Sequence, residues 1–269
     1  MRTIVFPTDF SLNSIHAIRY GINLFEGQDV RFILFNSYVD PSVGASMTYV
    51  FEEHMKEISM TMLKKVYEEL KDEYGFSDLQ MELVNRYGDL PYALKPLLEE
   101  ENVDLVVMGS SGASGANISI FGSNSYATMK DAPCPVLAVP LQTPISRPER
   151  IGLASEEELS GDEEILEPLY ALARLHGAWV MGIHVSKKKS VVDADAEERT
   201  LFGNDRLPYI DLKVNDPLKG IELAIGENKI DLLSIIIPKR SLLDRIFHKS
   251  VSKQIAKQVS IPILALHAK

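Results

Sequence analysis

An internal repeat constrains the fold of this chain more than any other feature of its sequence. Residues 88–135 align without a gap with residues 215–262, at a constant offset of 127. At this offset, Asp104-Leu105 falls on Asp231-Leu232, and the apolar Pro-Val-Leu-Ala that begins at Pro135 falls on the Pro-Ile-Leu-Ala that begins at Pro262. A match of about 48 residues that preserves strand and cap positions indicates two copies of one domain.

The start of the repeat and its linker define the expected domain limits. Residues 4–9, Ile-Val-Phe-Pro-Thr-Asp, match residues 151–156, Ile-Gly-Leu-Ala-Ser-Glu, and His184 falls on Asn36. Residues 141–149 are mostly polar and contain two prolines, a composition typical of a linker. At 269 residues the chain is long for one domain and natural for two. We therefore expect domains at residues 1–141 and 149–269.

Apolar runs alternate with helical patterns through the first half. Strands are predicted at residues 3–6, 30–38, 79–86, 104–108 and 135–139. Helices are predicted from Ser11, as N-cap, to Phe25, over about 20 residues from Phe51, from Asp89 onward, and over residues 123–130. Pro96 lies inside the third of these helices and should bend or shorten that helix. Strands that alternate with helices predict an α/β fold, here two tandem domains, each a five-stranded parallel sheet with helices on both faces.

Two segments allow more than one interpretation. A stripe on the long helix could be a Met-rich binding face, but core packing is the favoured prediction; its residues are Phe51, Met55, Ile58, Met62, Val66 and Leu70. In the second half, residues 186–199 are rich in charge, and we expect a mobile loop there.

A glycine-spaced loop follows the strand predicted at 104–108. Gly109 and Gly112 come directly after it, and Gly122 and Ser123 follow after nine further residues, where a helix is expected. Glycines let a backbone approach a ligand and adopt positive φ, and a helix start offers unpaired N–H groups to an anion. Ser125 adds a hydroxyl. Such turns are common and most bind nothing, so the glycines alone leave phosphate binding open.

The spacing Gly109-x2-Gly112-x9-Gly122-Ser123 resembles the ATP-binding signature of the universal stress protein family. The resemblance extends over nearly the full chain, as a tandem pair of UspA-like domains with a Rossmann-like fold of the adenine nucleotide α-hydrolase class. It implies that Asp9 meets the adenosine, that the backbone near Ser37 reads adenine, and that the signature binds phosphates. The implied ligand-binding residues are Asp9, Ser37, Gly109, Gly112, Gly122, Ser123, Asn124 and Ser125. From the residues alone, Asp9 serves equally well as a ribose acceptor or a helix cap.

The resemblance also implies partners. Family domains pair through their last strands, so Val136–Val139 and Ile263–Leu266 would meet within one chain, and a homodimer stays open. The expected ligand is ATP, with ADP, AMP or another nucleotide as alternatives. Whether Mg²⁺ accompanies the nucleotide is left open. The signature is lost in the second half, where Ile236, Lys239 and Lys249 replace the three glycines. One nucleotide per chain is therefore predicted, and the basic loop 239–249 is read as a solvated face rather than an anion site.

Composition narrows the remaining function classes. The net charge of −10 argues against nucleic-acid or anionic-membrane binding, and no stretch approaches a membrane span. A cytoplasmic location is the expectation. Cys134 is alone and is predicted to be a small buried apolar side chain. No candidate base or carboxylate pair stands out, so a nucleotide-dependent stress-response binding protein is favoured over a slow ATPase or phosphotransferase, and over a nucleotide-free scaffold.

Overall fold

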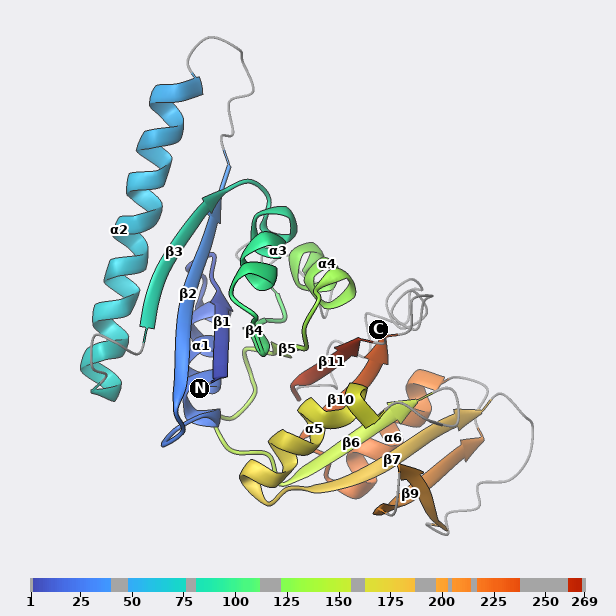
Figure 1. Ribbon diagram of the computed structural model, residues 1–269. Helices are drawn as coiled ribbons and strands as arrows, with labels where there is room; N and C mark the ends of the chain where they lie inside the picture. The colour runs from blue at the N-terminus through green and yellow to red at the C-terminus, as the bar shows by residue number, and fades with distance from the viewer. Residues whose placement is uncertain are drawn as a thin grey trace. The chain divides into compact units, whose positions relative to one another are not determined.

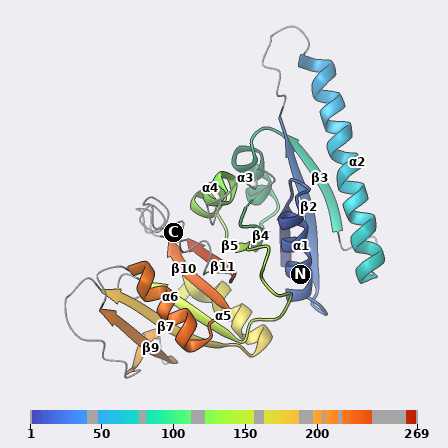
Figure 2. The same ribbon diagram turned by 180° about the vertical axis from the view of Figure 1, so that it is seen from behind.

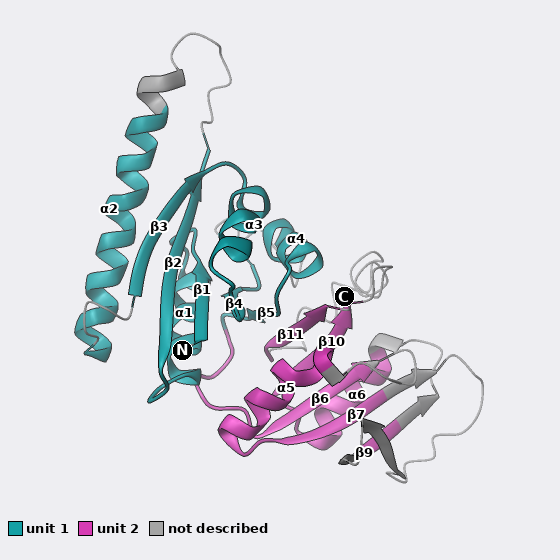
Figure 3. Cartoon of the chain, viewed as in Figure 1, with its two compact units in different colours: residues 1–116, 121–141 teal, residues 117–120, 142–269 magenta. Residues whose placement is uncertain are grey.

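The computed structural model describes residues 2–39, 48–75, 81–111, 122–155, 163–186, 197–202, 205–213, 217–237 and 261–267. The chain divides into two compact units, with the boundary between Leu141 and Gln142 (Figure 3). Each unit is an α/β structure in which helices alternate with mostly parallel strands (Figure 1). The predicted α/β fold class with two tandem copies is therefore confirmed.

Unit 1 is a five-stranded parallel sheet with helices on both faces. Its elements are β1 (Arg2–Pro7), α1 (Leu12–Leu24), β2 (Val30–Tyr38), α2 (Thr48–Tyr74), β3 (Met81–Tyr87), α3 (Leu90–Glu100), β4 (Leu105–Gly109), α4 (Ser123–Asp131) and β5 (Val136–Val139). The strand order is β3-β2-β1-β4-β5, and every pair is parallel. Helices α1 and α2 cover one face, while α3 and α4 pack together on the other (Figures 1 and 2). The order changes direction between β1 and β4, which is where α/β sheets bind ligands.

Most predicted boundaries in unit 1 agree with the structure to within two residues. Ser11 is the N-cap of α1, and its side chain accepts a hydrogen bond from the Ser14 N–H. The buried residues of α3 are Ala93, Leu94, Leu97 and Leu98. Asp89 is the N-cap of α3 without a side-chain cap bond, and the helix continues through Pro96 to Glu100. The proline therefore does not end the helix.

The core prediction for the stripe on α2 is wrong at two positions. Ile58 is 43% exposed and Met62 is 36% exposed, whereas the buried side chains on this helix include Ser59, Leu63 and Val66. Residues four apart on an α-helix drift by about 40° around its axis, because one turn takes 3.6 residues. Residues spaced mostly four apart therefore follow a line that winds around the helix. Val66 and Leu70 on this line face the sheet, whereas Ile58 and Met62, nearer the N-terminal end, have turned away from it. The Phe51 side chain lies outside the described part.

Unit 2 repeats this plan with a changed edge. Its elements are β6 (Arg150–Ser155), α5 (Glu163–His176), β7 (Trp179–Ser186), β8 (Glu197–Phe202), β9 (Asp205–Lys213), α6 (Pro217–Asn228), β10 (Leu232–Ile237) and β11 (Ile263–His267). The described strands follow the order β11-β10-β6-β7-β9-β8, and β8 alone is antiparallel to its neighbour. The loop predicted at 186–199 is therefore wrong at both described ends, because Ser186 belongs to β7 and residues 197–199 belong to β8. Residues 187–196 lie outside the described part.

The two units share the strand register that the repeat predicts. Val106 pairs with Val136 in unit 1, and Leu233 pairs with Ile263 in unit 2, each 127 residues later. Asp104 and Asp231 also play one role, since each carboxylate accepts backbone N–H groups at the start of the neighbouring strand. Asp104 accepts from Thr3 N at 2.8 Å, and Asp231 accepts from the N–H groups of residues 149 and 150 at 2.8 and 3.0 Å. The aligned aspartates therefore hold strands together.

Within the described ranges, no helix is both long enough and apolar enough to cross a membrane.

Candidate functional site

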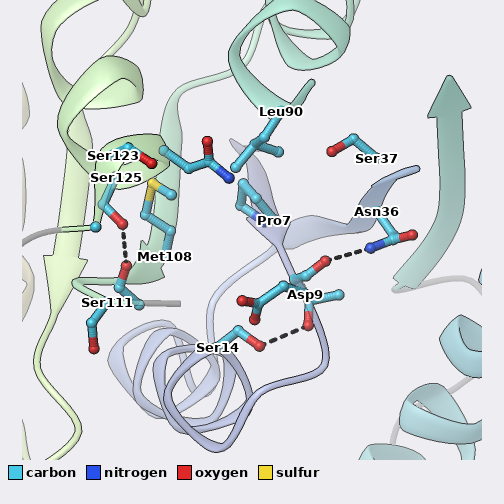
Figure 4. Close-up of a pocket in the computed structure, with 14 residues that line it drawn as sticks. Pro7, Asp9, Ser14, Asn36, Ser37, Leu90, Met108, Ser111, Ser123 and Ser125 are labelled. Atoms are coloured by element: carbon cyan, nitrogen blue, oxygen red, sulfur yellow. Dashed lines mark hydrogen bonds between the residues drawn. The ribbon is translucent and has the colours of Figure 1, made fainter. Parts of the chain in front are cut away.

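A pocket of about 210 Å³ opens in unit 1 beyond the carboxyl ends of β1, β2 and β4 (Figure 4). The described residues that line it are Pro7, Thr8, Asp9, Ser14, Asn36, Ser37, Leu90, Met108, Gly109, Ser111, Gly122, Ser123, Asn124 and Ser125. Four parts of unit 1 meet here: the β1–α1 turn, the end of β2, the first residue of α3, and the β4 end with the start of α4. This is the position that the change of strand order predicts.

Seven of the eight residues predicted from the sequence line this one pocket: Asp9, Ser37, Gly109, Gly122, Ser123, Asn124 and Ser125. The eighth, Gly112, lies outside the described residues. The sequence did not predict the other seven lining residues: Pro7, Thr8, Ser14, Asn36, Leu90, Met108 and Ser111. Asn36 was visible only as the counterpart of His184, and nothing in the pattern marked Ser14 or Ser111.

The β1–α1 turn has an unusual backbone that local hydrogen bonds support. Phe10 has φ +64, a backbone conformation that residues other than glycine rarely adopt. Its N–H donates to Thr8 Oγ1 at 3.0 Å, and that hydroxyl also bonds to Ser14 Oγ at 2.9 Å. The exposed Asp9 carboxylate accepts from the Ser11 N–H at 3.1 Å. Asp9 thus closes the turn, while the N-cap role of α1 belongs to Ser11.

The start of α4 presents hydrogen-bond donors to the pocket. Gly122 is the N-cap, and its lack of a side chain means that the N–H groups of Ser123, Asn124 and Ser125 receive no side-chain bond from the N-cap residue. The Gly122 N–H donates to Ser110 O at 2.8 Å, and Ser125 Oγ donates to Gly109 O at 2.8 Å. These two bonds fix the helix start against the end of β4. Unpaired N–H groups at the positive end of a helix favour an anion.

Gly109 is required by packing rather than by backbone conformation. A Cβ at this position would lie 2.9 Å from Asn13 Nδ2 and 3.1 Å from the backbone carbon of Asn13. Neither glycine has a positive φ: Gly122 has φ −65, and Gly109 is not one of the glycines with positive φ in the described part of the chain. The expectation that these glycines supply positive φ is therefore wrong. Gly109 instead admits the first turn of α1.

Asn13 uses that space to hold the chain that leaves β4. Its Nδ2 donates to Ser111 O at 2.8 Å and to Ser111 Oγ at 3.1 Å. Its Oδ1 is buried and has no hydrogen-bond partner among the described residues. The side chain thereby joins α1 to the start of the glycine-spaced loop.

The pocket offers hydrogen bonds rather than basic side chains. Among its described lining residues, Asp9 is the one with a formal charge, and none is lysine or arginine. Leu90 and Met108 supply apolar surface beside serine and asparagine side chains. In the described part, no cluster of three or more His, Cys, Asp or Glu side chains could hold a metal ion. The arrangement suits a ligand with a polar, hydroxyl-bearing part near Asp9 and an anionic part near α4.

Comparison with known proteins assigns the chain to a family. The model of the universal stress protein family matches residues 1–140, which is more than half of the 269 residues. The chain therefore belongs to the universal stress protein family.

Individual relatives agree with this assignment. A universal stress protein of Methanocaldococcus jannaschii is 31% identical over 142 residues, covering 51% of this chain and 81% of that protein. The universal stress protein YxiE of Bacillus subtilis is 27% identical over 138 residues, covering 49% of this chain and 93% of that protein. Both matches span about one of the two units.

Solved structures match the whole chain. The crystal structure of a universal stress protein from Archaeoglobus fulgidus aligns with a TM-score of 0.71 and 16% identity, covering 98% of this chain and 97% of that chain. A Pseudomonas aeruginosa protein described as functionally unknown aligns with a TM-score of 0.60 and 13% identity, covering 99% and 92%. These likenesses show the tandem fold.

Proposed function

We propose that unit 1 binds an adenine nucleotide, with ATP as the expected ligand, and that occupancy regulates a partner interaction in a stress response. The observation that carries the proposal is the meeting, in one pocket, of Asp9 and the uncapped start of α4. The first supplies acceptors for ribose hydroxyls, and the second supplies donors for phosphate oxygens. Membership of the universal stress protein family supports the same assignment.

The residues divide between the two ends of the ligand. Asp9 would accept hydrogen bonds from the ribose, and the backbone near Ser37 would face the base. Gly122, Ser123, Asn124 and Ser125 would hold the phosphates through N–H and hydroxyl groups. Gly112 belongs to this group by sequence spacing alone.

The charge of the pocket suggests how a triphosphate would be accommodated. Helix N–H groups carry about half a positive charge in total, and the described lining adds no basic side chain. Most of the charge on ATP would therefore need a companion cation, and Mg²⁺ commonly binds through nucleotide phosphates. We infer that Mg²⁺ strengthens ATP binding more than AMP binding.

Unit 2 is the proposed nucleotide-free partner. Ile236 stands in β10 at the position of Gly109, and an isoleucine side chain is incompatible with the close packing that Gly109 permits. Lys239, Lys249 and the basic loop 239–249 lie outside the described residues, as does Glu156, the counterpart of Asp9. Pairing of Val136–Val139 with Ile263–Leu266, or a homodimer, stays a prediction that the mass in solution and chemical cross-linking would test.

Titration of the purified full chain with ATP, ADP and AMP, with and without Mg²⁺, tests the proposal. We expect saturable binding with a stoichiometry near one, and no phosphate release on the timescale of binding. Asp9→Asn should weaken ATP and adenosine more than inorganic triphosphate, because it changes only the nucleoside end. A flat titration with every nucleotide would contradict nucleotide binding, and a stoichiometry near two would contradict the role given to unit 2.

A further inference from the structure

The side chain of Asn36 connects the pocket to the long helix α2. Its Nδ2 donates to Thr8 O at 2.7 Å, and its Oδ1 accepts from Ser59 Oγ at 2.7 Å. Asn36 is 7% exposed and Ser59 is 4% exposed, so both bonds are shielded from water. A carbonyl oxygen only accepts hydrogen bonds, so the amide nitrogen must face Thr8 and the amide oxygen must face Ser59. Figure 4 shows the bond to the turn.

The bond from Asn36 completes the support of Thr8. The Thr8 N–H donates to Phe35 O at 2.8 Å, and its hydroxyl is held by Ser14 and by the Phe10 N–H. The carbonyl is the remaining polar group of Thr8, and Asn36 holds it. Because Phe10 is in a costly backbone conformation, the turn keeps its shape only while its surroundings fix it. Asp9 lies between Thr8 and Phe10, so its position depends on the shape of this turn.

We propose that Asn36 is a positioning residue for the nucleoside end of the site, and that Ser59 makes this positioning depend on where α2 lies. The inference rests on the nucleotide binding proposed above. Asn36 orients the Thr8 carbonyl, which sets the direction of the following peptide and of the Asp9 carboxylate. A displacement of α2 that breaks the Ser59 bond would loosen the turn and weaken nucleoside binding. The phosphate end, built on α4, would be unaffected.

Asn85 provides a matched control on the neighbouring strand. It pairs in register with Asn36, and its Nδ2 donates to Lys56 O of α2 at 2.9 Å. Both asparagines therefore attach α2 to the sheet, but Asn36 also holds the pocket turn. If attachment of α2 were all that mattered, Asn85→Ala would weaken nucleoside binding as well.

Competition against a fluorescent ATP analogue on the full chain would test the proposal, with adenosine and inorganic triphosphate as separate competitors. For Asn36→Ala we expect the affinity for adenosine and ATP to fall about tenfold, as loss of one buried hydrogen bond would give, with triphosphate affinity unchanged. Asn85→Ala should leave all three affinities at the wild-type level. Equal effects of Asn36→Ala and Asn85→Ala, or an equal loss for adenosine and triphosphate, would overturn the proposal.

Variants of Ser59 distinguish an effect of positioning from an effect of direct contact with the ligand. Asn36 lines the pocket, whereas Ser59 is not among the described lining residues. Ser59→Ala should lower adenosine affinity about threefold, a fraction of one hydrogen bond, and Ser59→Thr should restore it by returning the hydroxyl. This pair also keeps the test open if Asn36→Ala fails to fold. Wild-type affinity in Ser59→Ala would refute the link to α2. Failure of the wild-type chain to bind ATP would instead refute the proposed function.

Discussion

The two units differ at the carboxyl ends of β4 and β10, although these strands share one register with their neighbours β5 and β11. Gly109 pairs with Val139 in unit 1, and Ile236 pairs with Leu266 at the same step in unit 2. At Gly109 a Cβ would collide with Asn13 on α1. The comparison teaches that a glycine in a ligand-binding signature can act through packing. It allows α1 to approach, and α1 carries the hydrogen bonds that shape the Asp9 turn.

A second contrast concerns the segment between β2 and β3 in unit 1 and the corresponding segment between β7 and β9 in unit 2. Unit 1 has the 27-residue helix α2 there, and unit 2 has the antiparallel strand β8 as the described element. Asn36 in unit 1 can bond to Ser59 because α2 passes over β2. In unit 2 His184 occupies the position of Asn36 and is in register with Asp211. The described elements of unit 2 therefore include no helix in the place of α2.

The largest expected effect comes from giving unit 1 the residue of unit 2. Gly109→Ile would place a Cβ within 3.1 Å of Asn13, so α1 would have to move. We expect loss of ATP binding and destabilisation by about 1–3 kcal/mol, as overpacked cores show. Calorimetric titration and thermal unfolding would measure both. Ile236→Val is the matched control in unit 2, and it should leave ATP affinity unchanged. Wild-type affinity in Gly109→Ile would refute the packing argument.

A smaller effect is expected at Gly122, where the backbone accepts any residue. Its φ of −65 and ψ of 159 are extended, so Gly122→Asp should fold and should cap α4 with its carboxylate. That carboxylate would occupy the N–H groups proposed for phosphate and repel the ligand. We expect at least a roughly tenfold loss of triphosphate affinity, with stability unchanged or raised by a few tenths of a kcal/mol. Gly122→Ala is the control, since it adds a Cβ without an acceptor.

If Gly122→Asp bound triphosphate as tightly as Gly122→Ala does, the anion could not lie at the start of α4. Because stability should not fall, this variant separates a ligand effect from a folding effect. Gly109→Ile cannot make that separation, since both properties should change together.

Much of this fold could be predicted because its signals are local. Apolar runs give the strands, and Ser11 at the start of a helical pattern gives the boundary of α1. The gathering of Asp9 and Gly109 also followed from the sequence, since parallel strands bring their carboxyl ends to one edge. Strand β8 was missed because it begins with three charged residues, Glu197, Glu198 and Arg199. Such a start resembles a solvated loop and gives no sign of the pairing with β9.

The supporting side chains could not be predicted, because their partners are distant in sequence. Asn36 bonds to Ser59 across 23 residues, and Asn13 bonds to Ser111 across 98. An isolated asparagine in a strand or at a helix start gives no sign of which carbonyl it will meet. The exposed Ile58 and Met62 were misplaced for a related reason. Their spacing fits an amphipathic helix, but only the sheet decides which side of that helix is covered.

The smallest predicted effect concerns Cys134, which falls on Ile261 in the repeat. The thiol is buried, as expected, and burial raises its pKa from 9.0 to about 12, with the negative charge of Asp104 adding to the shift. An unfolded thiol loses its proton above pH 9, whereas the folded one keeps it, so unfolding releases a proton in this range. The stabilisation is complete below pH 9 and is lost as the pH rises toward 12.

Between pH 7.5 and 9.5 this loss should reach about 0.8 kcal/mol. Unit 2 has no equivalent group at Ile261, so the effect belongs to unit 1 alone. Urea unfolding of the wild type and of Cys134→Ala at both pH values would isolate it, because lysines and tyrosines titrate alike in the two proteins. The difference in unfolding free energy between them should shrink as the pH rises. A difference that stays constant from pH 7.5 to 9.5 would mean that the thiol of Cys134 ionises as readily in the folded chain as in the unfolded one.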